Sequence, residues 1–391
     1  MNRNSQKWGE LPTLVLGQMY EYLEPRDRLN ASLACKHWRS VLFQKRFFTN
    51  FKLKLHVDND RQCKFFRHTL HHLTSELIII FDFLNVFHIE KIRRILYKIA
   101  RCDNLQGLRF QTNSVGLVPP GDISEESLAL SRPQELKALT LASIKYDPSH
   151  YPMFSMENTL LQKCSTLQVL SLDYDTLTEE LLHAIEILPL KKFLISVHGL
   201  DRHHRGISER AWSEFSANFN NIELIVSLIY AFEAVEVLQV RILRQNMPIT
   251  HLRVLFCDYS IQWIDSAYKH SNKNIMDLFL RSGQDPFVMM SWRCKNLEEI
   301  VIHGYVLDPH NIVGISRLRG RTLKRLEVSM IDSTPTEASM DSFIEEINTL
   351  LGQKWGPLNL NNVHPALGYL PVPDDVRDEY VFDLIRRDIS N

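Results

Sequence analysis

Apolar residues recur along most of the chain with one spacing, in which the first, fourth and sixth positions of a short segment are apolar. The first positions of successive copies lie 22 to 32 residues apart, and a weaker copy begins at Ile222. One such unit cannot bury its own apolar face, whereas stacked units bury it against their neighbours. The pattern therefore predicts an α/β solenoid in which each unit gives one strand of a curved parallel sheet and a returning helix. The clear copies begin at Leu105, Leu136, Leu167, Leu190, Leu252, Ile275, Leu297 and Leu323.

Within each unit, successive strand residues point to opposite faces of the sheet, so the residue between the last two apolar positions is expected on the open concave face. In the early units these residues are polar: Arg109, Thr140 and Ser171. In five consecutive later units they are apolar, and an apolar stripe of this kind is typical of a protein-binding surface. We therefore predict a substrate-binding stripe formed by Leu194, Val226, Phe256, Phe279 and Val301.

The C-terminal segment provides an alternative use of that stripe. Apolar residues from Leu367 to Val372 precede a predicted helix over Asp374–Arg387. A tail stays ordered only when contacts hold it in place, so this one either folds back over the stripe or leaves it open. Both outcomes are compatible with the sequence.

Three cysteines share one position in the repeat. Cys102, Cys164 and Cys294 each lie three residues before the first leucine of their unit. Equivalent positions have equivalent surroundings, so we expect reduced, buried packing residues rather than a metal site. Two returning helices are predicted at Thr178–Leu188 and Ser208–Phe219, each with a hydroxyl residue at its N-cap.

The first fifty residues have a different, helical pattern. Apolar residues from Val15 to Leu23 recur at helical spacing after Leu11-Pro12, and Glu24-Pro25 interrupts the run. Two further short helices are predicted up to Leu42. Three helices in about 40 residues form a very small core, and such a unit often gains stability by burying apolar surface against a partner.

This segment resembles an F-box. The family pattern begins LP, continues with apolar residues at helical spacing, and ends in a Cys-Lys-x-Trp run. Departures are Leu14, where an acidic residue is frequent, Ala34 in place of Val, and Gly17 inside the first helix. The matching residues stand in register without a gap: Leu11, Pro12, Val15, Leu16, Met19, Tyr20, Tyr22, Leu23, Pro25, Arg26, Asp27, Leu29, Leu33, Cys35, Lys36 and Trp38.

The resemblance implies a partner and a role. An F-box docks on a small acidic Skp-type adaptor, which bridges to a cullin scaffold, and cysteine-containing leucine-rich repeats are a common C-terminal partner of F-boxes. The chain is then the non-catalytic substrate receptor of an SCF-type ubiquitin ligase that recruits an unknown target protein. Alternatives are an adaptor-binding scaffold that joins no cullin, and an enzyme carried by the solenoid. The resemblance implies that adaptor contacts, or their direct support, come from Leu11, Pro12, Met19, Leu23, Leu33, Cys35 and Trp38.

Composition narrows the function classes further. The formal net charge is -1, which gives no overall field for nucleic acid or anionic membrane. The apolar run Leu77–Phe87 is too short to cross a bilayer and is predicted to be a buried strand, and residues 1–10 do not resemble a signal peptide. Six cysteines do not form a disulfide framework in a chain this long, so a cytosolic or nuclear location is expected.

Sequence motifs for catalysis and cofactors do not appear. The chain has no P-loop, no GxSxG, no HExxH and no dinucleotide fingerprint. The histidine clusters His68/His71/His72 and His198–His204 lack the carboxylate or cysteine set that would complete a metal site. We therefore expect no catalytic residues, no metal and no cofactor. The predicted divisions are an F-box over 8–48, a joining region of strands and a helix over 49–98, the solenoid over 99–353 and a tail over 354–391.

Overall fold

The structure is a computed structural model of the 391-residue chain. It describes residues 8–55, 60–82, 85–99, 104–112, 133–144, 158–198, 204–219, 221–231, 242–257, 286–332, 337–358, 364–367 and 372–390.

The N-terminal residues form the three predicted helices: α1 (Thr13–Glu21), α2 (Pro25–Ala31) and α3 (Lys36–Leu42). Short 3-10 turns, η1 (Trp8–Glu10) and η2 (Lys45–Phe47), flank them. Their buried core contains only Leu16, Tyr20, Val41 and Leu42. Gly17 lies beside the end of the Arg46 side chain, whose guanidinium is 3.4 Å from Glu21 Oε1 and is exposed enough to move aside for a larger residue at position 17.

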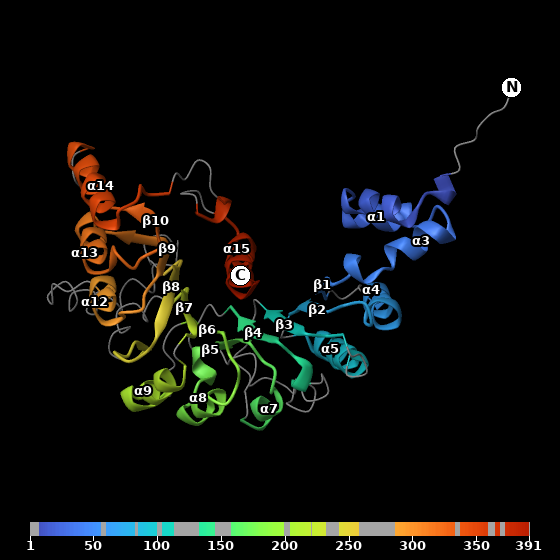
Figure 1. Ribbon diagram of the computed structural model, residues 1–391, viewed down its shortest axis with the longest axis horizontal. Helices are drawn as coiled ribbons and strands as arrows, with labels where there is room; N and C mark the ends of the chain where they lie inside the picture. The colour runs from blue at the N-terminus through green and yellow to red at the C-terminus, as the bar shows by residue number, and fades with distance from the viewer. Residues whose placement is uncertain are drawn as a thin grey trace.

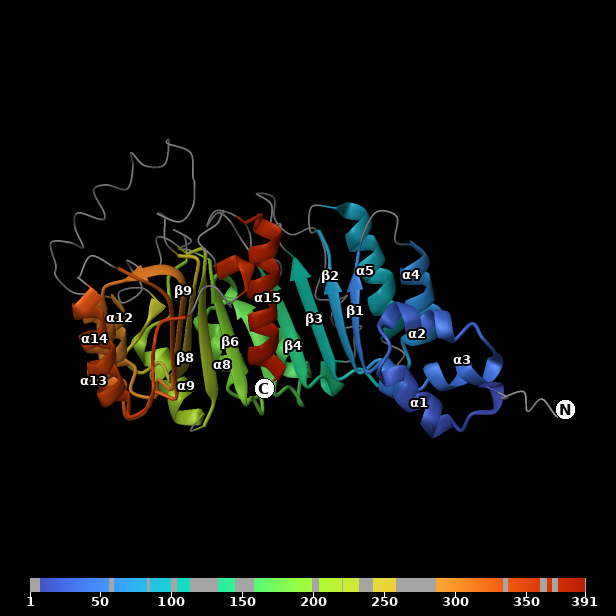
Figure 2. The ribbon, with the colours of Figure 1, turned by 90° about the horizontal axis from the view of Figure 1, so that it is seen from above.

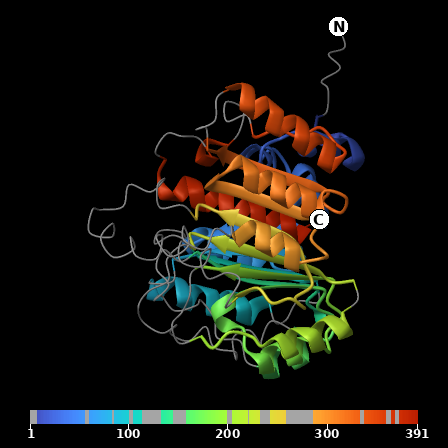
Figure 3. The ribbon, with the colours of Figure 1, turned by 90° about the vertical axis from the view of Figure 1, so that its left-hand side faces the viewer.

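Behind these helices the described residues form one parallel sheet of ten strands in sequential order, and the sheet curves as a solenoid requires (Figures 1 and 3). This arrangement confirms the predicted fold class. The strands are β1 (Asn50–Lys54), β2 (Glu76–Ile80), β3 (Gly107–Thr112), β4 (Ala138–Ser143), β5 (Val169–Asp173), β6 (Lys192–Val197), β7 (Glu223–Ile229), β8 (Ile249–Leu255), β9 (Glu299–Leu307) and β10 (Arg325–Ile331).

Helices cover the convex side of the sheet (Figure 1). The predicted N-caps are present in two of them, because Thr178 accepts a hydrogen bond from Leu181 N and Ser208 accepts one from Ala211 N. The convex elements are α4 (Asp60–Phe65), the π-helical turn η3 (Phe66–Leu70), α5 (Val86–Ile99), α7 (Asn158–Lys163), α8 (Glu179–Ile185), α9 (Glu209–Asn218), α12 (Pro286–Arg293), α13 (Pro309–Arg319) and α14 (Glu337–Leu351). Further 3-10 turns are η4 (Pro133–Glu135), η5 (Tyr174–Thr176) and η9 (Pro365–Leu367).

The sheet begins earlier than the predicted start of the repeats at residue 99. Strands β1 and β2 pair in parallel from Asn50 opposite Glu76, and β2 continues into β3. Residues 49–98, expected to be a joining region, thus contain the first two strands of the same sheet. The three-helix unit is packed directly onto this end, since Phe43 stacks on Phe48 at 5.7 Å and meets Phe65 edge-on at 6.0 Å.

The tail folds back into the concave side of the solenoid. Helix α15 (Asp374–Ser390) lies against the concave face, well separated in sequence from the strands beside it (Figure 2). Its buried side chains form a second apolar core together with residues of β6, β7 and β8. Of the two outcomes open from the sequence, the structure has the covered one.

The repeat cysteines within the described residues are buried. Cys164 and Cys294 are packed into the main core, while Cys102 lies outside the described residues. Burial raises the pKa of the Cys164 thiol to about 11 and that of Cys294 to about 12.

We therefore expect both thiols to react with iodoacetamide at pH 8 at least about a hundredfold more slowly than they do in the unfolded chain, because the thiolate is the nucleophile. Peptide mass spectrometry after timed alkylation of the native and urea-unfolded protein measures the difference. Rapid labelling of both thiols in the native protein would contradict their shared packing position.

None of the helices in the described part of the chain is both long enough and apolar enough to cross a membrane.

Candidate protein-binding surfaces

The three-helix unit leaves many large apolar side chains at its surface. Tyr22 is 90% exposed and Leu33 is 70% exposed, although the whole unit has a core of four residues. Exposed apolar groups at this density are typical of surfaces that bind other proteins. The exposed set is Trp8, Leu14, Val15, Met19, Tyr22, Leu29 and Leu33.

The seven predicted adaptor residues divide into two groups. Pro12, Met19 and Leu33 lie at the surface. The other four are half-buried, and Leu11, Leu23 and Trp38 among them pack against the small core. Three of the seven residues are therefore exposed and available for contact, and the other four, Cys35 among them, are half-buried beneath or beside that surface.

Trp38 illustrates the supporting role. Its ring meets Tyr20 edge-on with centroids 6.1 Å apart, and its Nε1–H donates to the Trp8 carbonyl at 2.9 Å. The Tyr20 hydroxyl donates back to the Trp38 carbonyl at 3.1 Å. Truncating Trp38 would remove core contacts as well as surface, so it is a weaker probe of binding than Leu33.

On the concave side, α15 covers the apolar residues of the central strands. Leu194, Ile225 and Leu255 form one buried cluster with the apolar side chains of the helix. The helix contributes Val381, Leu384, Ile385 and Ile389 to this cluster.

Two of the five residues predicted for the substrate-binding stripe are buried in this cluster, and one faces the other way. Leu194 and Phe256 lie in the cluster under α15. Val226 was expected on the concave face, which is wrong: it pairs with Ile195, and both belong to the core between sheet and helices. The concave residue of β7 is Ile225, opposite Leu194.

Of the remaining two stripe residues, the structure describes one. Val301 pairs with Arg253 on β8 and is fully buried. Phe279 lies outside the described residues. The stripe is therefore not an open surface over the residues that can be placed.

Phe256 belongs to the concave cluster because of its backbone conformation. It follows the last residue of β8 with a φ of 55°, in the left-handed region, so strand alternation no longer decides its direction. Its ring stacks on Tyr230 at 5.8 Å and meets Tyr380 of α15 edge-on at 6.2 Å.

A buried polar chain also ties α15 to the sheet. Tyr380 Oη lies 2.7 Å from His303 Nδ1, and His303 Nε2 lies 2.9 Å from Glu327 Oε1. Burial alone would raise the pKa of Glu327, but hydrogen bonds from His303 and Arg325 outweigh it and lower that pKa to about 2. An ionised carboxylate only accepts, so Nε2 of His303 carries a proton and, in the neutral ring, Nδ1 accepts from Tyr380.

Beside the C-terminal end of α15 the structure forms a charged groove of about 930 Å³. It follows the N-terminal ends of strands β6 to β10 and is closed on one side by the last turn of the helix. We call it the charged groove. Its charged and histidine lining is Lys192, Glu223, His251, Arg253, Lys295, Glu298, Glu299, Lys324, Arg325, Arg387 and Asp388.

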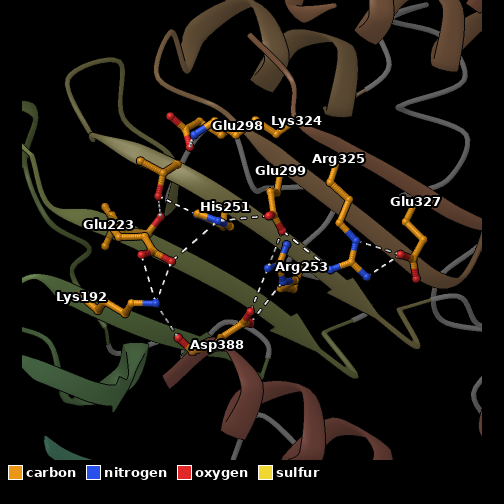
Figure 4. Close-up of polar contacts among 12 residues, drawn as sticks. Lys192, Glu223, His251, Arg253, Glu298, Glu299, Lys324, Arg325, Glu327 and Asp388 are labelled. Atoms are coloured by element: carbon orange, nitrogen blue, oxygen red, sulfur yellow. Dashed lines mark hydrogen bonds and ion pairs between the residues drawn. The ribbon is translucent and has the colours of Figure 1, made fainter. Parts of the chain in front are cut away.

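Arg253 is the central residue of this network (Figure 4). Its guanidinium lies 2.8 Å from Asp388 of α15 and 3.0 Å from Glu299 of β9, with the side chain only 2% exposed. Burial would lower the pKa of Arg253, but these two carboxylates outweigh it and raise the pKa. The same sheet edge holds the helix end through Lys192, whose Nζ donates to the Asp388 carbonyl at 3.1 Å, as cations at helix C-termini do.

His251 lies between two carboxylates of neighbouring strands (Figure 4). Its Nε2 atom is 3.7 Å from Glu223 and 3.6 Å from Glu299. The interaction with His251, reinforced by Arg253, lowers the pKa of Glu299 to about 2 against the opposing effect of burial. Glu299 is therefore ionised at neutral pH.

The histidine clusters noted in the sequence have other contacts. His198 Nε2 lies 3.2 Å from a buried Asp173 carboxylate, and His204 contacts the Leu177 carbonyl at 2.7 Å. The rings of His71 and His72 stand edge-on at 5.3 Å. Within the described ranges no three His, Cys, Asp or Glu side chains are grouped so as to hold a metal ion.

Known proteins are similar to this chain both in the three N-terminal helices and over most of its length. The F-box-like family matches residues 8–54. The human F-box only protein 33 is 21% identical, with 88% of this chain and 82% of that protein covered. The sheep F-box/LRR-repeat protein 21 is also 21% identical, with 90% of this chain and 89% of that protein covered. The chain thus has an N-terminal F-box-like domain followed by a parallel-sheet solenoid, and over most of its length it is similar to F-box proteins, one of them an F-box/LRR-repeat protein.

Proposed function

We propose that this chain is the substrate-recognition subunit of a Skp–cullin–F-box ubiquitin ligase. The observation that carries the proposal is the apolar surface of the F-box-like domain, which its own core of four residues leaves exposed. Exposed leucine and aromatic side chains are suited to the apolar contacts of a Skp-type adaptor. The adaptor residues we propose at this surface are Pro12, Met19 and Leu33, with Leu11, Leu23, Cys35 and Trp38 supporting them.

In this role the chain acts by proximity rather than by catalysis. One end binds the adaptor and, through it, a cullin, while the solenoid holds the target. Because Phe43 stacks on Phe48 and meets Phe65 of the first repeat, and all three pack against the solenoid core, the two ends are joined without a flexible linker. A fixed geometry raises the effective concentration of target lysines near the charged ubiquitin-conjugating enzyme. We place this activity in the cytosol or nucleus, where the free thiols of the described cysteines stay reduced.

The proposal is tested by purifying the tagged full chain from cells in which the proteasome is inhibited. We expect a Skp-type adaptor, a cullin and at least one further protein to co-purify, and that protein to receive ubiquitin when the complex is reconstituted. A chain that captures the adaptor without a cullin would instead support the second candidate, an adaptor-binding scaffold. Failure to capture any Skp-type adaptor would contradict both.

A further inference from the structure

The charged groove presents more positive than negative side chains. Six cations and four carboxylates line it, a surplus of two positive charges with His251 neutral. A polar, concave site of this volume lies within the ~300–1,000 Å³ range of ligand sites in proteins. The cations are Lys192, Arg253, Lys295, Lys324, Arg325 and Arg387, and the carboxylates are Glu223, Glu298, Glu299 and Asp388.

Four of the six cations are already paired within the groove. Lys192 lies 3.1 Å from Glu223, Lys324 lies 2.6 Å from Glu298, and Arg325 lies 3.8 Å from Glu299. Arg253 is bound by Glu299 and Asp388, and yet its Nη1 atom is buried without a hydrogen-bond partner. Even the best-paired guanidinium in the groove therefore keeps one unused donor.

Lys295 and Arg387 account for the surplus of two positive charges in the charged groove. Both are exposed, and neither has a carboxylate partner among the residues that the structure describes. Lys295 precedes β9, and Arg387 lies in the last turn of α15, so the two come from separate elements that border the groove.

The shape of the groove fits an extended chain. It follows the starts of five adjacent strands, which at ~4.8 Å spacing span roughly 19 Å. That length corresponds to about six residues of extended polypeptide.

We propose that the charged groove binds an acidic segment of the target protein, with carboxylate side chains paired to Lys295 and Arg387. The inference rests on the proposed function, because it gives the recruited target its recognition chemistry. Since both cations are exposed, each pair is weak alone and screened by salt, and several must act together along the segment.

The test uses the full chain bound to its adaptor and a fluorescent ten-residue peptide of glutamate and glycine, with a glutamine–glycine peptide as reference. Fluorescence anisotropy measures both at low and at physiological salt. We expect the glutamate peptide to bind more tightly than the glutamine peptide, and the difference to shrink as salt rises. Lys295→Gln with Arg387→Gln should weaken glutamate-peptide binding by about tenfold.

A matched pair, Lys163→Gln with Arg61→Gln, removes the same two charges from exposed positions on α7 and α4, on the convex side. This control should bind the glutamate peptide as the unmodified chain does. If both double variants lose the same affinity for the glutamate peptide, or if the two peptides bind equally well, the proposed peptide site is wrong. The proposed function would still stand in either case, provided that the chain captures its adaptor. Binding of a phosphoserine peptide without binding of the glutamate peptide would also overturn it, in favour of a phosphate-specific site.

Discussion

Replacing Leu33 with serine is expected to weaken binding of a Skp-type adaptor by about thirtyfold or more, with little effect on the fold. The side chain is 70% exposed, so its truncation removes almost no core packing, and surface substitutions usually change the free energy of unfolding by about 0.5 kcal/mol or less. If Leu33 is an anchor of the interface, its loss costs about 2 kcal/mol or more of binding free energy, which corresponds to roughly thirtyfold in Kd. Calorimetric titration of the full chain with purified adaptor measures this change.

Ile187→Ser is the matched control for that experiment. Ile187 is also a large aliphatic residue, it is 68% exposed, and it lies in the solenoid between α8 and β6. It should leave adaptor affinity unchanged. If Leu33→Ser binds the adaptor as tightly as the control does, Leu33 is not an anchor and the assignment of the exposed surface is wrong.

The F-box-like domain could be predicted in detail because its signal is local. Helix spacing, the break at Glu24-Pro25 and the ungapped family pattern all lie within about 40 residues, and the structure has α1, α2 and α3 there. The division of the predicted adaptor residues into surface and support was not available from sequence. It depends on how three short helices pack, for example on Trp38 lying against Tyr20.

Strand register could be predicted where only one face of a strand is apolar. In β3 and β10 the positions expected in the core, such as Leu108 and Leu326, are there. Strand β7 reads Glu-Leu-Ile-Val-Ser-Leu-Ile and is buried on both faces, so alternation gives no preference between two registers one residue apart. The covering by α15 is the physical reason for the apolar second face, and it is also why Val226 was assigned to the wrong side.

Two further features escaped sequence reasoning for different reasons. Strand β1 has the repeat spacing at Phe48, Phe51 and Leu53, but in the next unit Thr74 takes the first apolar position before Leu77 and Ile79, so the series is interrupted and these strands were assigned to a joining region. The charged groove gathers residues from Lys192 to Asp388, and none of its ion pairs is visible as a local motif. A partial signal existed: Lys192, Glu223, Glu299 and Arg325 are each the first residue of their strand, which places charges along one edge of a parallel sheet.

Replacing Phe256 with alanine is expected to release α15 from the concave face while the solenoid stays folded. The Phe256 ring is buried, packs on Tyr230 and Tyr380, and has the Arg377 guanidinium 5.7 Å from its centroid. Removing a buried phenylalanine ring costs about 3–5 kcal/mol, and here Tyr380 and Arg377 both belong to α15. The loss therefore falls mainly on the docking of the helix, and a local loss of about 3 kcal/mol accelerates amide exchange by roughly a hundredfold.

Hydrogen–deuterium exchange over residues 372–390 measures this release. Phe215→Ala is the matched control, because Phe215 is a fully buried ring of α9 in the core on the convex side and not in the cluster under α15. Its loss should lower the free energy of unfolding without a selective effect on α15. Because Asp388, Leu384 and Arg387 line the charged groove from α15, the Phe256→Ala chain should also bind the glutamate peptide less tightly and still capture the adaptor. Equal protection of α15 in the two variants would show that Phe256 does not hold the helix in place, and that the polar contacts of Asp388 and Tyr380 with Arg253, Lys192 and His303 suffice to anchor it.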